Sequence, residues 1–194
     1  MPTFPRARTH THARAPDFNV PTNMTDRQSD SLSPQASRHT PVKPPAAGRR
    51  IQVRRSGVHG RGVYAIQPIA KHEVIIEYKG EMITWKQAER RHPHDPNDPD
   101  HTFYFHIDDD HVIDANFGGN AARWINHACK PNCESDIVGD RVFIKALRRI
   151  EPGEELFYDY GLVIDERYTK KLKKQFACRC GAKRCRGTML APKR

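Results

Sequence analysis

Short apolar runs separated by turn-forming residues make up most of the hydrophobic pattern from residue 51 onward. Runs of this length, alternating or continuous, are typical of β-strands. The segments that we predict as strands are 51–55, 73–78, 103–107, 111–114 and 141–147. A turn at Pro152-Gly153 precedes a further extended segment, 155–160, in which Tyr158 and Tyr160 share one face because side chains alternate along extended backbone.

Helical signals are short and few, and they fall at 84–92, 120–124 and 164–174. Thr84, with Gln87 three residues later, forms a capping box, and a polar, proline-rich loop over 92–101 follows that helix. Asn120 is a suitable N-cap for the second helix. Strands and helices do not alternate regularly. The pattern therefore predicts a β-rich fold, mainly β with short helices, and argues against a doubly wound α/β sheet.

Composition sets the first residues apart from the rest. Residues 1–50 contain eight of the fifteen prolines, one glycine, and two phenylalanines as their only aromatic residues. Such a segment cannot bury enough apolar surface to offset its ordering entropy. We therefore expect a disordered, basic, proline-rich tail over 1–48, a compact domain over 49–163 and a basic C-terminal segment over 164–194.

The net charge of +10 is unevenly distributed. Residues 1–50 have a net charge of +5 and residues 165–194 a net charge of +9, whereas residues 51–164 have a net charge of −4. The basic ends are either solvated tails or surfaces that contact nucleic acid or an acidic partner, and the pattern leaves both open. The mildly acidic middle region favours a basic peptide as its partner.

The chain shows no apolar run of the ~20 residues needed to span a bilayer, and no apolar core of a secretory signal peptide. Its arginine-rich start faintly resembles a transit peptide, but Pro2, Pro5 and Pro16 oppose the amphipathic helix that such a peptide needs. All five cysteines lie in the last third of the chain. An odd number without a signal peptide predicts reduced thiols in a cytosolic environment.

The glycine-rich loop over 56–62 matches a dinucleotide-binding fingerprint, with Gly60, Gly62 and Ala65 at the required spacing. That fingerprint needs a helix directly after the glycines, so that the helix N-terminus meets the pyrophosphate. Gln67-Pro68 and a strand follow instead. The loop is thus either a simple turn or a segment whose bare backbone lets a different cofactor approach closely.

Three cysteines, Cys178, Cys180 and Cys185, lie within eight residues. Thiolates at this spacing are typical of part of a tetrahedral zinc site, which needs a fourth ligand. Cys129 and Cys133 are the remaining thiols, and spacing alone does not choose between them. A site of this kind would tie the basic C-terminal segment to the middle of the chain.

Two stretches carry the most specific chemistry: a turn that contains Asn126-His127-Ala128-Cys129, and the segment 155–160 with its paired tyrosines. Together with four other blocks in one order, they resemble the SET-domain protein lysine methyltransferases that carry a post-SET zinc segment, in particular the trithorax-like histone-lysine methyltransferases. The six blocks are 56–65, 77–80, 105–108, 114–132, 153–160 and 178–185. The resemblance covers about residues 50–190.

This resemblance implies a SET-domain, β-clip-like fold whose C-terminal part threads through a loop as a pseudoknot, a topology that general rules discourage. Residues 49–163 would be the catalytic SET domain, and residues 164–194 a basic linker helix and the post-SET zinc segment. The Cys of the Asn-His-x-Cys turn is the fourth zinc ligand in the family. The implied zinc ligands are therefore Cys129, Cys178, Cys180 and Cys185, and Cys133 is left free.

The resemblance also implies S-adenosyl-L-methionine as the cofactor. The residues that would bind it are His59, Gly60, Arg61, Gly62, Phe103, Asn126, His127 and Leu190. Phe103 stands where similar sequences often have Tyr, which removes a hydroxyl group. Ala128 stands where Ser is more usual.

The target lysine would enter a channel from the face opposite the cofactor. The channel residues would be Phe103, Phe105 and Tyr158, and the catalytic residues Tyr160, Tyr78 and Tyr158. A lysine with a pKa of about 10.4 is mostly protonated and not nucleophilic, and an aromatic channel favours its neutral form. The family associates Tyr at the position of Tyr158 with mono- or dimethylation.

The expected partner is a basic protein or peptide, histone or histone-like, with nucleic-acid contact through the basic ends, no membrane association and a monomeric state. We expect a cytoplasmic location in a bacterium and a nuclear, chromosomal one in a eukaryote. The alternative to an active enzyme is a catalytically weak SET-fold binding module that uses its basic ends on nucleic acid or chromatin. The presence of Asn126, His127, Tyr78 and Tyr160 favours the enzyme.

Overall fold

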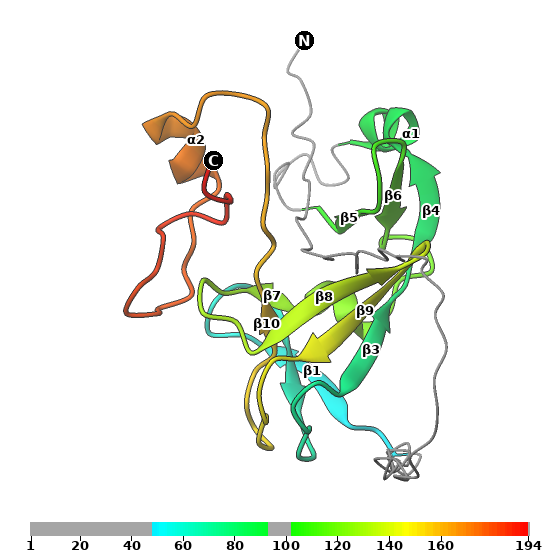
Figure 1. The fold of residues 1–194 in the computed structure, drawn as a ribbon, viewed down its shortest axis with the longest axis vertical. Helices are drawn as coiled ribbons and strands as arrows, with labels where there is room; N and C mark the ends of the chain where they lie inside the picture. The colour runs from blue at the N-terminus through cyan, green and yellow to red at the C-terminus, as the bar shows by residue number, and fades with distance from the viewer. Residues whose placement is uncertain (1–47, 93–101, 194) are drawn as a thin grey trace, which may run out of the picture. The chain divides into compact units, whose positions relative to one another are not determined.

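The fold is taken from a computed structural model, which describes residues 48–92 and 102–193. Residues 49–193 fall within one compact unit. Short β-strands account for most of the regular structure, with two α-helices and one 3₁₀ helix among the described residues (Figure 1). The prediction of a β-rich fold with short helices is confirmed.

Figure 1 shows a three-stranded antiparallel sheet next to β7 (Asn126–His127) and β10 (Phe157–Tyr158). Its strands lie in the order β3 (Val74–Tyr78), β9 (Arg141–Ala146) and β8 (Cys133–Val138). Val142, Ile144 and Ala146 of the middle strand are completely buried, because alternate residues of a strand point to the same face. They belong to the main apolar core of the unit.

A second antiparallel sheet has the order β4 (Glu81–Thr84), β6 (His111–Asp114) and β5 (Tyr104–His106), with α1 (Trp85–Arg91) beside it. The capping box predicted at Thr84 and Gln87 is present: the Thr84 side chain accepts from the Gln87 N–H, and the Gln87 side chain accepts from the Thr84 N–H. Trp85 and Ala88 turn toward the sheet and are buried.

Two smaller strand pairs bring distant parts of the chain together. The antiparallel pair consists of β1 (Ile51–Arg55) and β2 (Arg61–Ala65), with the glycine-rich loop between them. The parallel pair consists of β7 (Asn126–His127) and β10 (Phe157–Tyr158). The 3₁₀ helix η1 (Ala121–Trp124) leads into β7, and Asn120 caps it as predicted. The parallel pair therefore places the Asn-His segment beside the tyrosine segment.

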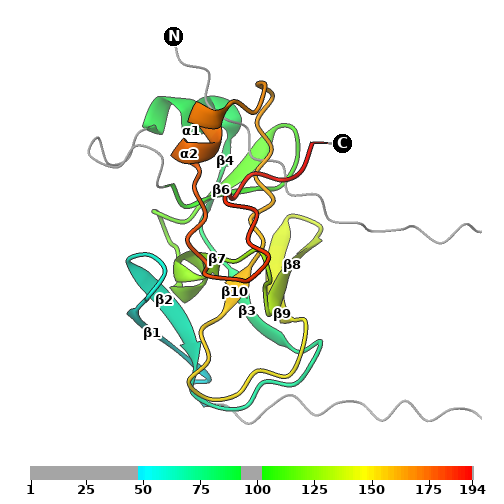
Figure 2. The same cartoon turned by 90° about the vertical axis from the view of Figure 1, so that its left-hand side faces the viewer.

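The C-terminal segment has its own small core, in which Ile164, Phe176 and Leu190 are buried. Figures 1 and 2 show this orange-to-red segment running beside β7 and β10. The helix predicted over 164–174 is wrong in its first half, because α2 covers Lys170–Gln175 and Thr169 is its N-cap. Residues 164–169 are instead irregular, with a bend at 165–166, and an isolated bridge joins residue 162 to residue 190 just before them.

The predicted strands are otherwise confirmed to within two residues, whereas β2, β4, β7 and β8 were not predicted. The tail over 1–47 and most of the loop over 92–101 lie outside the described residues. The domain boundaries and the threaded pseudoknot stay predictions. In the part of the chain that the structure describes, no helix is long and apolar enough to cross a bilayer.

Candidate active site and metal centre

A cavity of about 450 Å³ opens between the glycine-rich loop, η1, the parallel strand pair and the C-terminal segment. This volume is within the range of small-molecule sites. It brings together most of the residues that the sequence singled out. Those that line it are His59, Gly60, Arg61, Tyr78, Phe103, Phe105, Asn126, His127, Tyr158 and Tyr160.

The glycine-rich loop is fixed to the site by Asn126. The Asn126 side-chain amide donates to the carbonyl oxygens of His59 (3.2 Å) and Arg61 (2.8 Å), and to Oε1 of Glu155 (3.0 Å). Gly60 adopts a positive φ of 45° that favours glycine. Gly62 does not line the cavity, and a Cβ there would lie 2.1 Å from Glu155 Oε1. Gly62 therefore serves the close packing of the loop.

His127 has a defined tautomer. Its Nδ1 accepts from the Tyr160 backbone N–H at 3.1 Å, so Nδ1 carries no proton. Burial lowers the pKa of His127 to about 4, against the opposing effect of Asp159, so the ring is neutral at pH 7. The proton then lies on Nε2, which is 3.5 Å from the Cys129 sulfur. His127 thus links the tyrosine segment to the cysteine turn.

Tyr78, Tyr158 and Tyr160 contribute hydroxyl groups to the aromatic wall of the cavity. Burial raises the pKa of Tyr78, Tyr158 and Tyr160, so all three hydroxyls keep their protons at neutral pH. Tyr78 donates to the Phe103 carbonyl and Tyr160 to the Ile125 carbonyl, both at 2.9 Å. Their oxygen lone pairs remain available as acceptors. These hydroxyls are therefore suited to accept hydrogen bonds and unsuited to act as strong bases.

The Tyr158 hydroxyl has no hydrogen-bond partner among residues 48–92 and 102–193. Its ring is 4.9 Å from that of Tyr160 and 6.2 Å from that of Phe105, measured between centroids. The spacing of Tyr158 and Tyr160 by two residues predicted this shared face. A buried hydroxyl with free hydrogen-bonding capacity can hold a water molecule or a ligand group.

A stacked cationic cluster, which the sequence reasoning missed, lines the cavity beside Phe103. The Trp124 ring lies near two guanidinium groups, those of Arg61 at 4.9 Å and Arg123 at 4.6 Å from its centroid. Phe103 packs edge-on against Trp124 at 4.8 Å, and Arg123 also lies over Phe103. Neither arginine forms an ion pair within the described residues. This end of the cavity is therefore suited to an anionic group.

Leu190 lies elsewhere than its implied role requires. It is 1% exposed within the small C-terminal core and does not line the cavity. Its neighbour Met189 lines the cavity instead, together with Phe176. The C-terminal segment thus contributes Phe176 and Met189 to the cavity wall, and the role that the resemblance implies for Leu190 stays a prediction.

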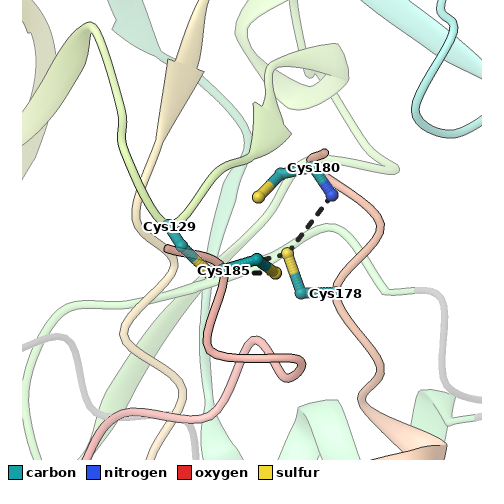
Figure 3. Close-up of side chains that lie close together, drawn as sticks. All are labelled: Cys129, Cys178, Cys180 and Cys185. Atoms are coloured by element: carbon teal, nitrogen blue, oxygen red, sulfur yellow. Dashed lines mark hydrogen bonds between the residues drawn. The ribbon is translucent and has the colours of Figure 1, made fainter. Parts of the chain in front are cut away.

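The four cysteines implied as zinc ligands converge (Figure 3). Their sulfur atoms all lie within 4.8 Å of one another, and that of Cys129 is 3.6 Å from Cys178 and 3.8 Å from Cys185. A tetrahedral site with Zn–S bonds of about 2.3 Å requires sulfur atoms about 3.8 Å apart. These separations exclude disulfide bonds. The donor set fits a structural zinc ion.

Two N–H groups near the Cys129 sulfur support a thiolate at this position. The Arg186 backbone N–H donates to Cys129 Sγ at 3.4 Å, and Nε2–H of His127 faces the same atom. Donors of this kind orient and stabilise metal-bound ligands. Cys133 has a different environment: it is fully buried in the main core, and burial raises the pKa of its thiol to about 12. The structure therefore groups Cys129, and not Cys133, with the C-terminal cysteines.

A protein-family model described as "SET domain" matches residues 60–161. This span is more than half of the chain. It contains the end of the glycine-rich loop from Gly60 onward, η1, both strands of the parallel pair, and Tyr78, Tyr158 and Tyr160. The chain belongs to the SET-domain family.

Named relatives agree with this assignment. The chain is 43% identical to the histone-lysine N-methyltransferase trithorax of Drosophila melanogaster over 140 residues. The matched region is 70% of this chain and 4% of the relative. Over 165 residues it is 39% identical to histone-lysine N-methyltransferase 2B of Homo sapiens, covering 82% of this chain and 6% of the relative. Over 138 residues it is 44% identical to the "histone-lysine N-methyltransferase, H3 lysine-4 specific" of Candida albicans, covering 69% of this chain and 13% of the relative.

The chain therefore spans only a small part of the length of these relatives, between 4% and 13%. The resemblance to trithorax-like proteins is confirmed over the SET region.

Proposed function

We propose that this chain transfers methyl groups from S-adenosyl-L-methionine to the side-chain amine of lysine in a basic protein, histone or histone-like. The observation that carries this proposal is one cavity that contains both a glycine-rich cofactor loop and a wall of hydroxyl-bearing rings. Family membership and the printed names of the relatives, which are histone-lysine N-methyltransferases, support the same reaction.

When bound, S-adenosyl-L-methionine supplies an electrophilic methyl group on a sulfonium sulfur. The loop of His59, Gly60 and Arg61 would border it through backbone groups that Asn126 holds in place. The guanidinium groups beside Trp124 would attract its carboxylate. Phe103 offers only its ring at this wall, so the hydroxyl that a tyrosine would supply is missing.

The tyrosines would prepare the lysine amine. Buried rings around an amine disfavour its charged form, so the lysine loses its proton to water before it attacks. The hydroxyl oxygens of Tyr78 and Tyr160 already donate to carbonyls, so they can accept from the amine and orient its lone pair. Holding both reactants in line can lower the barrier by roughly 7–11 kcal/mol.

Transfer of labelled methyl groups to histone H3 and to a mixture of basic proteins tests this proposal. Tyr160→Phe removes one hydroxyl, and we expect a loss of rate of about 100-fold, the order of effect of one positioned donor or acceptor. Tyr168→Phe is the matched control, because the Tyr168 hydroxyl lies in the small C-terminal core with contacts of 3.4 and 3.5 Å only. If the folded wild-type protein neither binds the cofactor nor transfers labelled methyl groups, the alternative holds, and the chain is a SET-fold binding module.

The free Tyr158 hydroxyl supports mono- or dimethylation. A water molecule held by this hydroxyl would occupy the space that an additional methyl group needs. We expect Tyr158→Phe to shift the products toward trimethyllysine, as measured by mass spectrometry of a methylated peptide. An unchanged product distribution would contradict this part of the proposal and leave the reaction itself intact.

A zinc ion would be held by Cys129, Cys178, Cys180 and Cys185. Its role would be structural, because all four positions of a tetrahedral site are filled by protein thiolates. The ion would join the C-terminal wall of the cavity, with Phe176 and Met189, to the turn that follows β7.

The C-terminal segment also supports contact with nucleic acid. Eight of its basic side chains are exposed and form no ion pair within the described residues. They are Arg167, Lys170, Lys171, Lys173, Lys174, Arg179, Lys183 and Arg184. An unpaired cationic surface beside the cavity fits the phosphate backbone to which basic, DNA-binding substrates are bound. A nuclear, chromosomal location in a eukaryote follows from the same partners.

Salt-dependent binding of a DNA duplex, followed by fluorescence anisotropy, tests this contact. A variant in which Lys170, Lys171 and Lys173 are replaced by Gln should reduce the slope of log K against log salt by about 2–3, because each lost phosphate contact removes about 0.9. Replacement of the exposed body residues Lys71, Lys79 and Lys86 by Gln is the control of equal charge. Equal slopes in the two variants would show that the cations are merely solvated.

A further inference from the structure

An ion pair connects the C-terminal segment to the tyrosine segment. The Arg186 guanidinium donates to both carboxylate oxygens of Asp159, at 2.5 Å to Oδ2 and 2.8 Å to Oδ1. Both side chains are partly shielded, with 25% and 35% of their surfaces exposed. Two parallel N–H···O bonds fix the relative orientation of the groups as well as their distance.

The ion pair connects directly to the cavity, because Asp159 belongs to the tyrosine segment. Asp159 lies between Tyr158 and Tyr160, and its Oδ1 also accepts from the Gly161 N–H at 3.0 Å. The same oxygen lies 3.4 Å from Nδ1 of His127, the atom that accepts the Tyr160 N–H. Burial raises the pKa of Asp159, but the hydrogen bonds from Arg186 and Gly161 outweigh it and lower the pKa overall. The carboxylate is therefore charged at neutral pH.

The other end of the pair borders the metal centre. Arg186 directly follows Cys185, and its backbone N–H donates to the sulfur of Cys129. Cys129 in turn faces Nε2 of His127. The contacts thus close a ring that runs from Cys129 through His127, the backbone around Tyr160 and Asp159 to Arg186, and back to Cys129.

We infer that Asp159 and Arg186 are positioning residues for methyl transfer, which hold the tyrosine segment in register with the C-terminal wall of the cavity. This inference rests on the proposed function. A single ion pair that is still partly open to solvent contributes little to stability, commonly about 0–1 kcal/mol. The pair therefore matters chiefly for geometry, since a displacement of about 1 Å at a reacting group can cost about 100-fold in rate.

Steady-state kinetics with a histone H3 peptide and S-adenosyl-L-methionine tests the inference. Arg186→Met should lower kcat by about 10- to 100-fold and leave the KM for the peptide within about 2-fold, because the tyrosine hydroxyls move while the peptide surface does not. Arg186→Lys keeps the charge without the two-pronged contact and should recover part of kcat. Asp159→Asn should resemble Arg186→Met, and the double variant should be no slower than either single variant.

The matched control is Arg149→Met, which breaks an exposed arginine–carboxylate pair with Glu151 away from the cavity. Its kcat should equal that of the wild type. Zinc content by mass spectrometry and the melting temperature should be the same in all variants. A wild type that transfers no methyl overturns the proposed function, and the inference with it. An active wild type with an equally active Arg186→Met variant overturns the inference alone, as does loss of zinc from that variant.

Discussion

The two regions that meet at the cavity are stabilised by different interactions. The sheets share one extended apolar core, with fully buried residues such as Val63, Ile144 and Leu156. The C-terminal segment has three buried apolar residues, a cysteine cluster and an ion pair. Burial of apolar surface is a non-directional stabilisation, whereas metal bonds and ion pairs fix particular atoms. The sheets thus form a rigid scaffold. The C-terminal segment forms a cavity wall that is held in place by a few specific contacts.

We expect the largest effect from removal of the metal ion, which should loosen the C-terminal segment and leave the sheets intact. Chelation of the zinc ion proposed for the cysteine cluster should expose the backbone of residues 170–190 to hydrogen exchange, because their small core cannot hold them alone. The amides of β3, β8 and β9 should keep their protection. Hydrogen exchange followed by mass spectrometry, with and without chelator, measures both regions at once. A single cooperative loss of protection throughout the chain would contradict the division.

A substitution that leaves a cavity in the main core should destabilise the sheets. Ile144→Ala removes three carbon atoms from a completely buried position in the middle strand, and it should lower the free energy of unfolding by about 2–5 kcal/mol. Phe176→Ala should instead increase exchange within residues 170–190 and leave the unfolding of the sheets unchanged. Val138→Ala, at a position that is 57% exposed, should change denaturant unfolding by less than about 0.5 kcal/mol.

The smallest expected effect concerns the thiol that belongs to the scaffold. Because burial raises the pKa of Cys133 to about 12, its thiolate fraction stays negligible from pH 7 to pH 9. Alkylation of Cys133 in the folded protein should therefore stay slow across this range, whereas an exposed thiol with a pKa of about 8.5 reacts faster as the pH rises. Peptide mass spectrometry after iodoacetamide treatment measures this.

Replacement of the same thiol completes that test. Cys133→Ala should bind as much zinc as the wild type, whereas Cys129→Ala should lose it. Equal zinc loss in both variants would mean that the two thiols share the metal.

The sequence predicted those features that depend on local pattern. Short apolar runs marked β3, β5, β6 and β9, and the Thr84 capping box marked α1. The strands β2 and β8 were missed because glycine, arginine and acidic residues interrupt their apolar pattern. The two-residue strand β7 is too short to leave any periodic signal, whereas β10 lies within the extended segment predicted over 155–160.

Features of the site that depend on contacts between residues far apart in the sequence could not be predicted from local sequence patterns. The three C-terminal cysteines predicted a metal centre, but only the family resemblance favoured Cys129 before the coordinates grouped it with them. The exchange of Leu190 for Met189 at the cavity wall is a shift of one residue, which depends on how the segment turns. The contact of Arg186 with Asp159 joins residues of two separate segments and leaves no trace in either.

The parallel pairing of β7 with β10 has a consequence for biosynthesis. Most of the scaffold strands precede β10 in the chain, and the cysteines at 178, 180 and 185 follow it. A nascent chain can therefore assemble much of its sheet structure on the ribosome while the C-terminal wall of the cavity is still missing. That wall can form only after Cys185 has left the exit tunnel and the four cysteines can meet.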